Sequence, residues 1–121
     1  MEPVLLCDDD RRLLDLFGRI LTAAGYRVLT AADGEEAVRV SLREKPDLVL
    51  MDIAMPVMDG LKATSRIKAA DPNVVIIALT SHALPDEVQR GLDAGCDGYI
   101  LKPEDPQDLP RQIRLCLAED V

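Results

Sequence analysis

Short aliphatic runs alternate with amphipathic stretches along the whole chain. The runs cover residues 4–7, 26–30, 47–51, 74–79 and 98–101. Apolar runs of this length, bounded by turn residues, predict five strands. Between the first two runs, Leu13, Phe17, Ile20 and Leu21 recur at helical spacing, and Gly25 is placed to end that helix.

Capping residues mark the other predicted helices. Asp33 and Glu36 resemble a capping box, which would open a second helix that stops before Pro46. A third helix follows residues 59–60 and ends at 71–72, and a fourth runs from 85 to 95. The last helix covers about 109–118, and its regular part is expected to begin near Gln107 or Asp108 because Pro110 cannot donate a hydrogen bond further in.

Strands that alternate with helices are expected to pair in parallel, and aliphatic strands such as 74–79 are expected to be buried on both faces. The predicted fold class is therefore α/β, a doubly wound (βα)5 parallel five-stranded sheet in a three-layer sandwich. Right-handed crossovers favour the strand order 2-1-3-4-5, with ligands bound beyond the carboxyl ends of the first and third strands. No linker or repeat interrupts the pattern, so residues 1–121 are expected to form one domain.

Composition and charge narrow the possible partners. The 22 acidic and 14 basic residues give a net charge of -8, which disfavours direct binding to nucleic acids or to anionic membranes. The three cysteines lack the CxxC spacing of zinc or redox sites, and no apolar run approaches the roughly 20 residues of a membrane span. We therefore expect a cytoplasmic domain.

Polar side chains follow four of the five predicted strands. The first strand ends in Asp8-Asp9-Asp10, the third in Asp52, the fourth in Thr80-Ser81 and the fifth in Lys102-Pro103. In the order 2-1-3-4-5 the first and third strands are neighbours, about 4.8 Å apart, so Asp52 is expected beside Asp8 and Asp9. Carboxylates so close repel one another, and Mg²⁺, which prefers oxygen ligands, is the expected compensating ion.

This set of groups suits phosphoryl transfer. An aspartate carboxylate can act as a nucleophile and form a covalent intermediate. The transition state then needs positioning, a cation, and donors such as an ammonium or a hydroxyl. Asp9, Asp52, Thr80 and Lys102 meet these requirements.

Four segments, in order and at matching spacing, resemble one protein family. They are VLLCDDD, PDLVLMDIAMPVMDG, VVIIALTSHA and AGCDGYILKP. Together they resemble the receiver domain of two-component response regulators over the full length of the chain. The resemblance implies a flavodoxin-like fold and a domain switched by phosphorylation.

Carried over by position, the resemblance assigns roles to individual residues. Asp52 would be the phosphorylated residue, Asp9 the direct ligand of Mg²⁺ and Asp8 its ligand through water. The backbone carbonyl of Ala54 would complete the protein's share of the metal shell. Lys102 would pair with the phosphoryl group.

The resemblance also implies a switch. Thr80 would move to form a hydrogen bond with the phosphoryl group. Tyr99 would turn inward when Thr80 moves. Pro103 would follow a cis peptide bond that directs Lys102. The phosphoryl group would come from a sensor histidine kinase or a phosphotransfer protein. An output protein or domain would bind the face formed by the fourth helix, the fifth strand and the last helix.

Two other functions remain open at this level. The Asp8-Asp9-Asp10 run also resembles the DxD of haloacid dehalogenase-like phosphatases, with Asp8 as nucleophile, although no cap segment is present. A receiver fold that is never phosphorylated could instead act as an adaptor. In the leading interpretation the chain is not an enzyme beyond self-phosphorylation and autodephosphorylation, and it is either a stand-alone receiver or part of a larger regulator or hybrid kinase.

Overall fold

The computed structural model describes residues 3–53, 55, 58–81 and 84–118. Its strands are β1 (Val4–Cys7), β2 (Val28–Ala31), β3 (Leu48–Met51), β4 (Val75–Thr80) and β5 (Gly98–Leu101). Its helices are α1 (Arg11–Ala23), α2 (Gly34–Glu44), α3 (Gly60–Ala70), α4 (Pro85–Ala94), the 3-10 turn η1 (Pro106–Asp108) and α5 (Leu109–Ala118).

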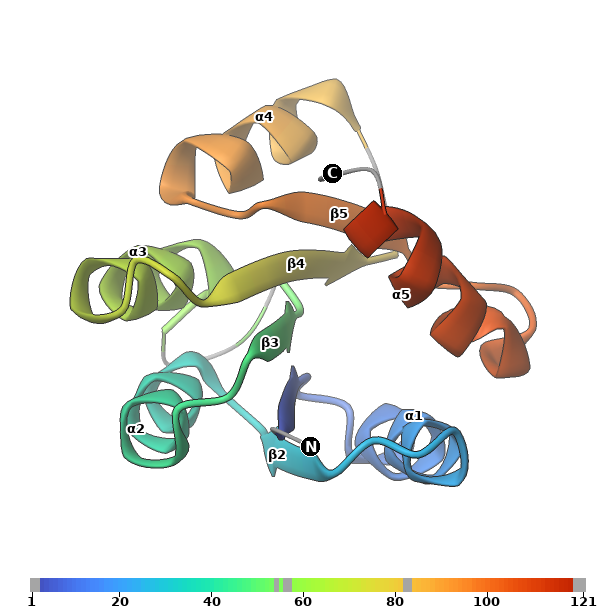
Figure 1. Ribbon diagram of the computed structural model, residues 1–121. Coiled ribbons are helices and arrows are strands. Elements are labelled where there is room, and N and C mark those ends of the chain that lie inside the picture. Colours follow the sequence, from blue (N-terminus) through green and yellow to red (C-terminus); the bar gives the residue numbers. More distant parts are fainter. Residues whose placement is uncertain (1–2, 54, 56–57, 82–83, 119–121) are drawn as a thin grey trace.

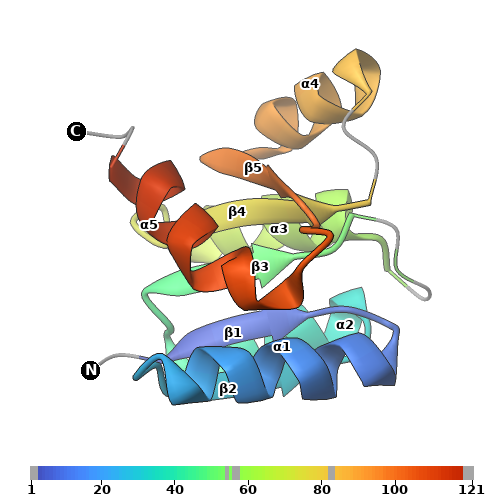
Figure 2. The ribbon, with the colours of Figure 1, turned by 90° about the vertical axis from the view of Figure 1, so that its right-hand side faces the viewer.

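The five strands form one parallel sheet in the order β2-β1-β3-β4-β5, which confirms the predicted topology. Helices α2 and α3 cover one face, and α1 and α5 lie side by side on the other (Figures 1 and 2). Helix α4 lies beside α3 near the β5 edge of the sheet (Figure 1). The result is the three-layer (βα)5 sandwich expected from the sequence.

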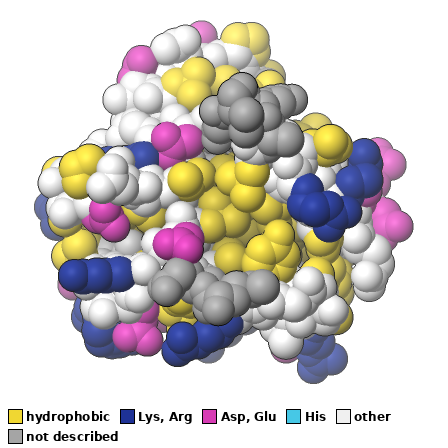
Figure 3. Space-filling model, in the orientation of Figure 1, with side chains coloured by type: hydrophobic (Ala, Val, Ile, Leu, Met, Phe, Trp, Pro, Cys, Tyr) yellow, Lys and Arg dark blue, Asp and Glu magenta, His cyan; other side chains and the backbone are white. Residues whose placement is uncertain are grey.

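The core is aliphatic on both faces of the sheet. Alternate residues of β1 point to opposite sides, so Leu5 packs with α2 and α3 while Leu6 packs with α1 and α5. Both side chains are fully buried. On the face where the N-terminus lies, apolar side chains occupy the middle and charged ones surround them (Figure 3).

Aspartates cap several helices and hold the loops at the end of the sheet where the strands terminate. Asp33 Oδ1 accepts from the Glu36 N–H at 2.8 Å, as its capping pattern predicts, and Asp59 Oδ1 accepts from the Lys62 N–H at 2.9 Å. Asp10 caps α1 in the same way through the Arg12 N–H. Each cap satisfies a backbone donor that the helix itself leaves unpaired.

Several element boundaries differ from the sequence prediction by one or two residues, including the starts of β3 and β4 by one residue each. Strand β2 begins at Val28 instead of Tyr26, because the Tyr26 N–H still donates to Leu21 O in the turn that ends α1 around Gly25. The last helix starts with η1, and α5 itself begins only at Leu109. Pro110 therefore lies in the first turn of α5, where its missing N–H is tolerated.

The expected cis bond before Pro103 is wrong. None of the peptide bonds in the described ranges is cis, and Lys102 and Pro103 both belong to those ranges. The trans form is the commoner state of an X–Pro bond. The direction of Lys102 is set by its backbone, since its N–H donates to Thr80 O at 2.7 Å.

The C-terminal end of helix α4 and the turn that follows it are tied to α3 and β4. Ser65 Oγ donates to Ala94 O at 3.3 Å, and Lys68 Nζ pairs with Asp97 Oδ2 at 2.8 Å. The same Asp97 oxygen accepts from the Ile76 N–H at 2.8 Å. Of the ten residues of α4, all of them described, Gly91 alone is buried.

No helix in the described part of the chain combines the length and apolar character that crossing a bilayer requires.

Candidate functional site

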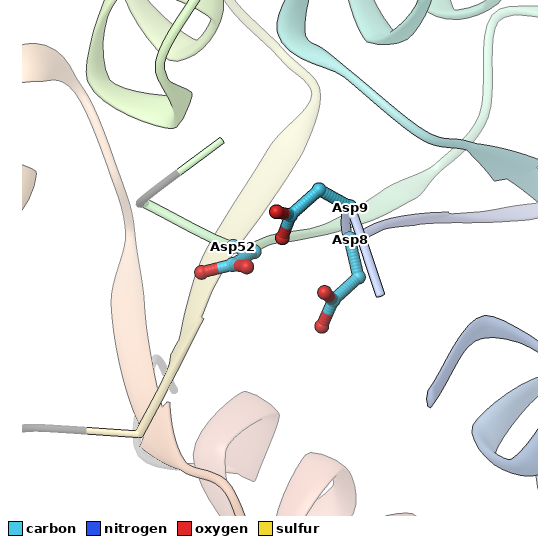
Figure 4. Close-up of side chains that lie close together, drawn as sticks. All are labelled: Asp8, Asp9 and Asp52. Atoms are coloured by element: carbon cyan, nitrogen blue, oxygen red, sulfur yellow. The ribbon is translucent and has the colours of Figure 1, made fainter. Parts of the chain in front are cut away.

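The carboxyl ends of β1 and β3 bring three aspartates together. Cys7 lies opposite Met51 in the sheet, so the residues that follow them, Asp8 and Asp52, emerge next to each other. The Asp52 N–H donates to Cys7 O at 3.0 Å, which holds the two strand ends together. One carboxylate oxygen from each of Asp8, Asp9 and Asp52 lies within 4.8 Å of the other two (Figure 4). The predicted convergence of these residues is confirmed.

The three carboxylates differ in their access to solvent. Asp8 is 1% exposed and Asp52 is 8% exposed, whereas Asp9 is exposed at the rim. Asp8 Oδ1 accepts from the Asp10 N–H at 2.9 Å, which orients its carboxylate. Two negative charges are thus held largely out of water, and such charges need a partner.

Lys102 provides part of the positive charge that these carboxylates need. Its Nζ lies 2.8 Å from Asp8 Oδ2 and 3.7 Å from Asp52 Oδ2. The ammonium reaches the site from the end of β5, on the far side of β4 from β3. One ammonium among three carboxylates leaves an excess of negative charge, which favours the binding of a cation.

The donor set fits Mg²⁺. All three groups offer carboxylate oxygens, the hard ligands that this ion prefers. Oxygens that lie within 4.8 Å of one another are close enough to share one ion, and the exposed Asp9 leaves room for the water ligands that Mg²⁺ retains. The carbonyl of Ala54, the fourth predicted ligand, lies outside the described residues.

Thr80 and Tyr99 occupy different sides of the site. Thr80 ends β4, is 8% exposed, and lines the pocket of about 640 Å³ that contains the three aspartates and Lys102. Tyr99 is 47% exposed and does not line that pocket. Both residues do line a small apolar cavity beneath α4, together with Ile53 and Val88.

The pocket also includes residues that the sequence analysis missed. Glu87 and Arg90 of α4 line it opposite the aspartates, and Leu61 of α3 contributes apolar surface. Glu87 and Arg90 are three positions apart and so share one face of α4. No motif and no local sequence pattern predicts that these two residues line the pocket.

The Cys7 thiol is buried beside the site. Its side chain is fully buried, and this burial raises the pKa of the thiol far above its usual range, with Glu36, Asp8 and Asp52 adding to the effect. The neutral thiol packs in the core like a small apolar side chain. The candidate functional groups of the pocket are therefore the aspartates, Thr80 and Lys102.

The fold and this acidic pocket define a class of protein, and comparison with known proteins agrees. The response regulator receiver domain family matches residues 4–114. The transcriptional regulatory protein PrrA of Mycobacterium tuberculosis is 36% identical over 114 residues, which are 94% of this chain and 49% of that protein. The probable transcriptional regulator ycf27 of Guillardia theta is 42% identical over 118 residues, which are 96% of this chain and 45% of that protein.

Solved structures give the same result. Chemotaxis protein CheY4 of Vibrio cholerae superposes with a TM-score of 0.89 at 30% identity, covering 96% of this chain and 98% of that one. A CheX–CheY complex from Borrelia burgdorferi, solved with BeF3 and Mg²⁺, matches with a TM-score of 0.87 at 31% identity over 96% of this chain and 89% of that one. The chain belongs to the receiver domain family of two-component response regulators.

A receiver domain is a phosphoacceptor and not a turnover enzyme, so the dehalogenase-like phosphatase is rejected as an alternative. The chain spans about half the length of the curated relatives that it matches.

Proposed function

We propose that residues 1–121 form one receiver domain that is switched by phosphorylation of Asp52. The observation that carries the proposal is the position of the Asp52 carboxylate, which has an oxygen within 4.8 Å of oxygens of Asp8 and Asp9 and its Oδ2 3.7 Å from Lys102 Nζ. A nucleophile, a set of metal ligands and a fixed cation thus meet at one strand end. The phosphoryl donor is a sensor histidine kinase or a phosphotransfer protein, as the family implies.

Each residue has a separate task in the transfer. A carboxylate oxygen of Asp52 attacks phosphorus, and the new O–P bond forms as the P–N bond to the donor imidazole breaks, leaving the electron pair on that nitrogen. Asp8, Asp9 and Asp52, with the backbone carbonyl of Ala54, would hold Mg²⁺. When bound, Mg²⁺ neutralises phosphoryl oxygens. Lys102 pairs with the transferred group, and its contact with Asp8 keeps the ammonium in the pocket.

The switch connects this pocket to the surface. Thr80 donates a hydrogen bond to the phosphoryl group, and the movement opens space for Tyr99 to turn inward. The small cavity beneath α4, which both residues already line, supports this coupling. The phosphoryl group favours the arrangement in which it gains the donor contact, so it shifts the population of the two states.

The output surface is the face formed by α4, β5 and α5. Large apolar side chains are exposed there, including Leu92, Tyr99, Leu101 and Leu115. Tyr99 belongs to both the cavity and this surface, so a change in its position alters what a partner protein meets. We place the domain in the cytoplasm, with a protein partner on this face and no direct contact with nucleic acid or membrane.

Intact mass after incubation with acetyl phosphate and Mg²⁺ tests the proposal. Wild type should gain one phosphoryl group that hydroxylamine removes, and Asp52→Asn should gain none. The Asp59→Asn variant is a matched control, since it alters a pocket carboxylate with the same loss of charge but leaves the three-aspartate cluster intact. An adduct that persists in Asp52→Asn would refute the assignment. If neither acetyl phosphate nor candidate kinases label the wild type, the domain is an unphosphorylated adaptor.

A further inference from the structure

Two glycines begin the helices that flank residues 53–59, the segment that follows Asp52. Gly34 is the first residue of α2 and Gly60 is the first residue of α3. Neither has the left-handed backbone that would by itself require glycine. The reason for glycine at both positions is therefore space.

Gly60 holds the first residue of this segment, Ile53, through a backbone hydrogen bond. Its N–H donates to Ile53 O at 2.7 Å, and a Cβ at this position would lie 2.1 Å from Asp52 O. The first turn of α3 thus lies directly against the backbone of the phosphoacceptor. Further along, Met55 is buried in the same core cluster as Ala37 of α2 and Ala63 of α3.

Gly34 fixes the end of the segment from the opposite side. A Cβ at Gly34 would lie 1.9 Å from Met58 O and 2.7 Å from Met58 C. The obstacle is backbone, so it cannot rotate away as a flexible side chain could. Residue 58 immediately precedes Asp59, the cap of α3, and the contact therefore holds the segment where it joins the helix.

We propose that Gly34, which contributes nothing to the lining of the acidic pocket, is a positioning residue for phosphorylation of Asp52. By allowing α2 to touch the Met58 backbone, it holds the far end of the segment whose near end carries Asp52. This inference rests on the proposed function. The backbone of Asp52 is then held directly by α3 at Gly60 and indirectly by α2 at Met58, which pre-organises its carboxylate for attack and for metal binding.

The structure sets the size of the expected effect. An alanine at position 34 requires the Met58 backbone to retreat by about 1 Å before the Cβ–O contact reaches the 3.0 Å that real Cβ atoms need. Misplacement of a reacting group by about 1 Å can cost on the order of 10²-fold in rate. Because the shift is imposed at Met58 and not at Asp52 itself, we expect Gly34→Ala to slow phosphorylation by roughly 10- to 100-fold.

The experiment separates positioning from general instability. Phosphorylation by acetyl phosphate is timed at saturating Mg²⁺ and at a temperature where circular dichroism shows every variant folded. The Mg²⁺ dissociation constant is measured separately by calorimetry. Gly34→Ala should show a slower rate and weaker Mg²⁺ binding. Gly18→Ala is the matched control, because its Cβ would approach Val28 Cγ1 only to 4.0 Å, and it should keep the wild-type values.

A second variant covers the case in which Gly34→Ala does not fold. Met58→Ala removes the half-buried side chain that packs on the core cluster, and so loosens the same end of the segment without adding an atom. It should change the rate and the Mg²⁺ affinity in the same direction. Wild-type rate and affinity in a folded Gly34→Ala, or in Met58→Ala if the former is unfolded, overturn the inference. If neither acetyl phosphate nor a candidate kinase labels the wild type, the proposed function fails, and the Mg²⁺ affinities alone decide the role of Gly34.

Discussion

Replacement of Asp52 by asparagine should stabilise the metal-free protein. In the absence of Mg²⁺, the Asp52 carboxylate lies within 4.8 Å of two other carboxylates and 3.7 Å from Lys102 Nζ. Asparagine keeps the shape of the side chain but carries no charge. The substitution therefore reports the net electrostatic cost of placing a charge at this position.

The magnitude follows from these distances. At an effective dielectric constant of about 20, unit charges 4.8 Å apart interact by about 3.5 kcal/mol, and charges 3.7 Å apart interact by about 4.5 kcal/mol. Two repulsions against one attraction leave a net repulsion of about 2 kcal/mol. Solvent screens Asp9 and reduces this value, whereas the burial of Asp52 adds a desolvation cost. We expect the free energy of unfolding to rise by about 2 kcal/mol.

Urea denaturation at neutral pH in EDTA, followed by circular dichroism, measures this difference. Asp47→Asn is the control, because Asp47 is exposed and the substitution removes the same charge away from the pocket. It should change the free energy of unfolding by less than about 0.5 kcal/mol. Saturating Mg²⁺ should narrow the gap between wild type and Asp52→Asn, since the ion neutralises the repulsion. An Asp52→Asn protein that is no more stable than wild type in EDTA would refute the electrostatic argument.

Three further predictions concern the metal, helix α4 and the core cysteine. Mg²⁺ should raise the melting temperature of wild type because it binds the folded state, and Asp9→Ala should remove most of that rise in a thermal scan; an unchanged rise would place the ion elsewhere. Gly91→Ala should stabilise the fold by about 0.5–1 kcal/mol in urea, because alanine favours helices and its Cβ would meet Cys96 Sγ and Ile53 Cδ1 at an unstrained 3.9 Å; a loss of stability would show that α4 packs more tightly than described. Because the pKa of Cys7 is raised in the folded protein, the thiol loses its proton at a lower pH in the unfolded chain. The stability that the neutral Cys7 thiol contributes is therefore fully present below pH 9.0 and declines above it. Native protein at pH 8 should accordingly react with a thiol reagent first at the partly exposed Cys116, and mass mapping that finds Cys7 labelled as early would contradict its burial.

Much of this architecture was accessible from the sequence because it depends on local pattern. The apolar runs gave the bounds of β1 and β5 correctly, and the capping pattern at Asp33 located the start of α2. The handedness of parallel crossovers then leaves few strand orders. The observed order brings Asp8 and Asp52 together, so the centre of the site followed from topology alone.

The remaining features depend on contacts between segments far apart in the chain. Arg90 belongs to the pocket because α4 lies across from β1, which no local pattern records. The contact of Gly34 with the Met58 backbone likewise depends on how α2 packs beside α3. The conformation before Pro103 was predicted from resemblance, and the observed trans bond shows that a local motif does not determine it.

The contacts at the C-terminal end of α4 give this helix a fixed point there. Ser65 of α3 holds Ala94, and Lys68 of α3 holds Asp97 in the turn that follows. Leu84, which precedes the first residue of the helix, is 60% exposed. Ten residues of helix extend about 15 Å, so a rotation of about 10° about the C-terminal end would move the N-terminal end by about 2–3 Å. Glu87 and Arg90 of this helix line the acidic pocket and Leu92 is exposed, so such a rotation would change the pocket and the exposed surface together.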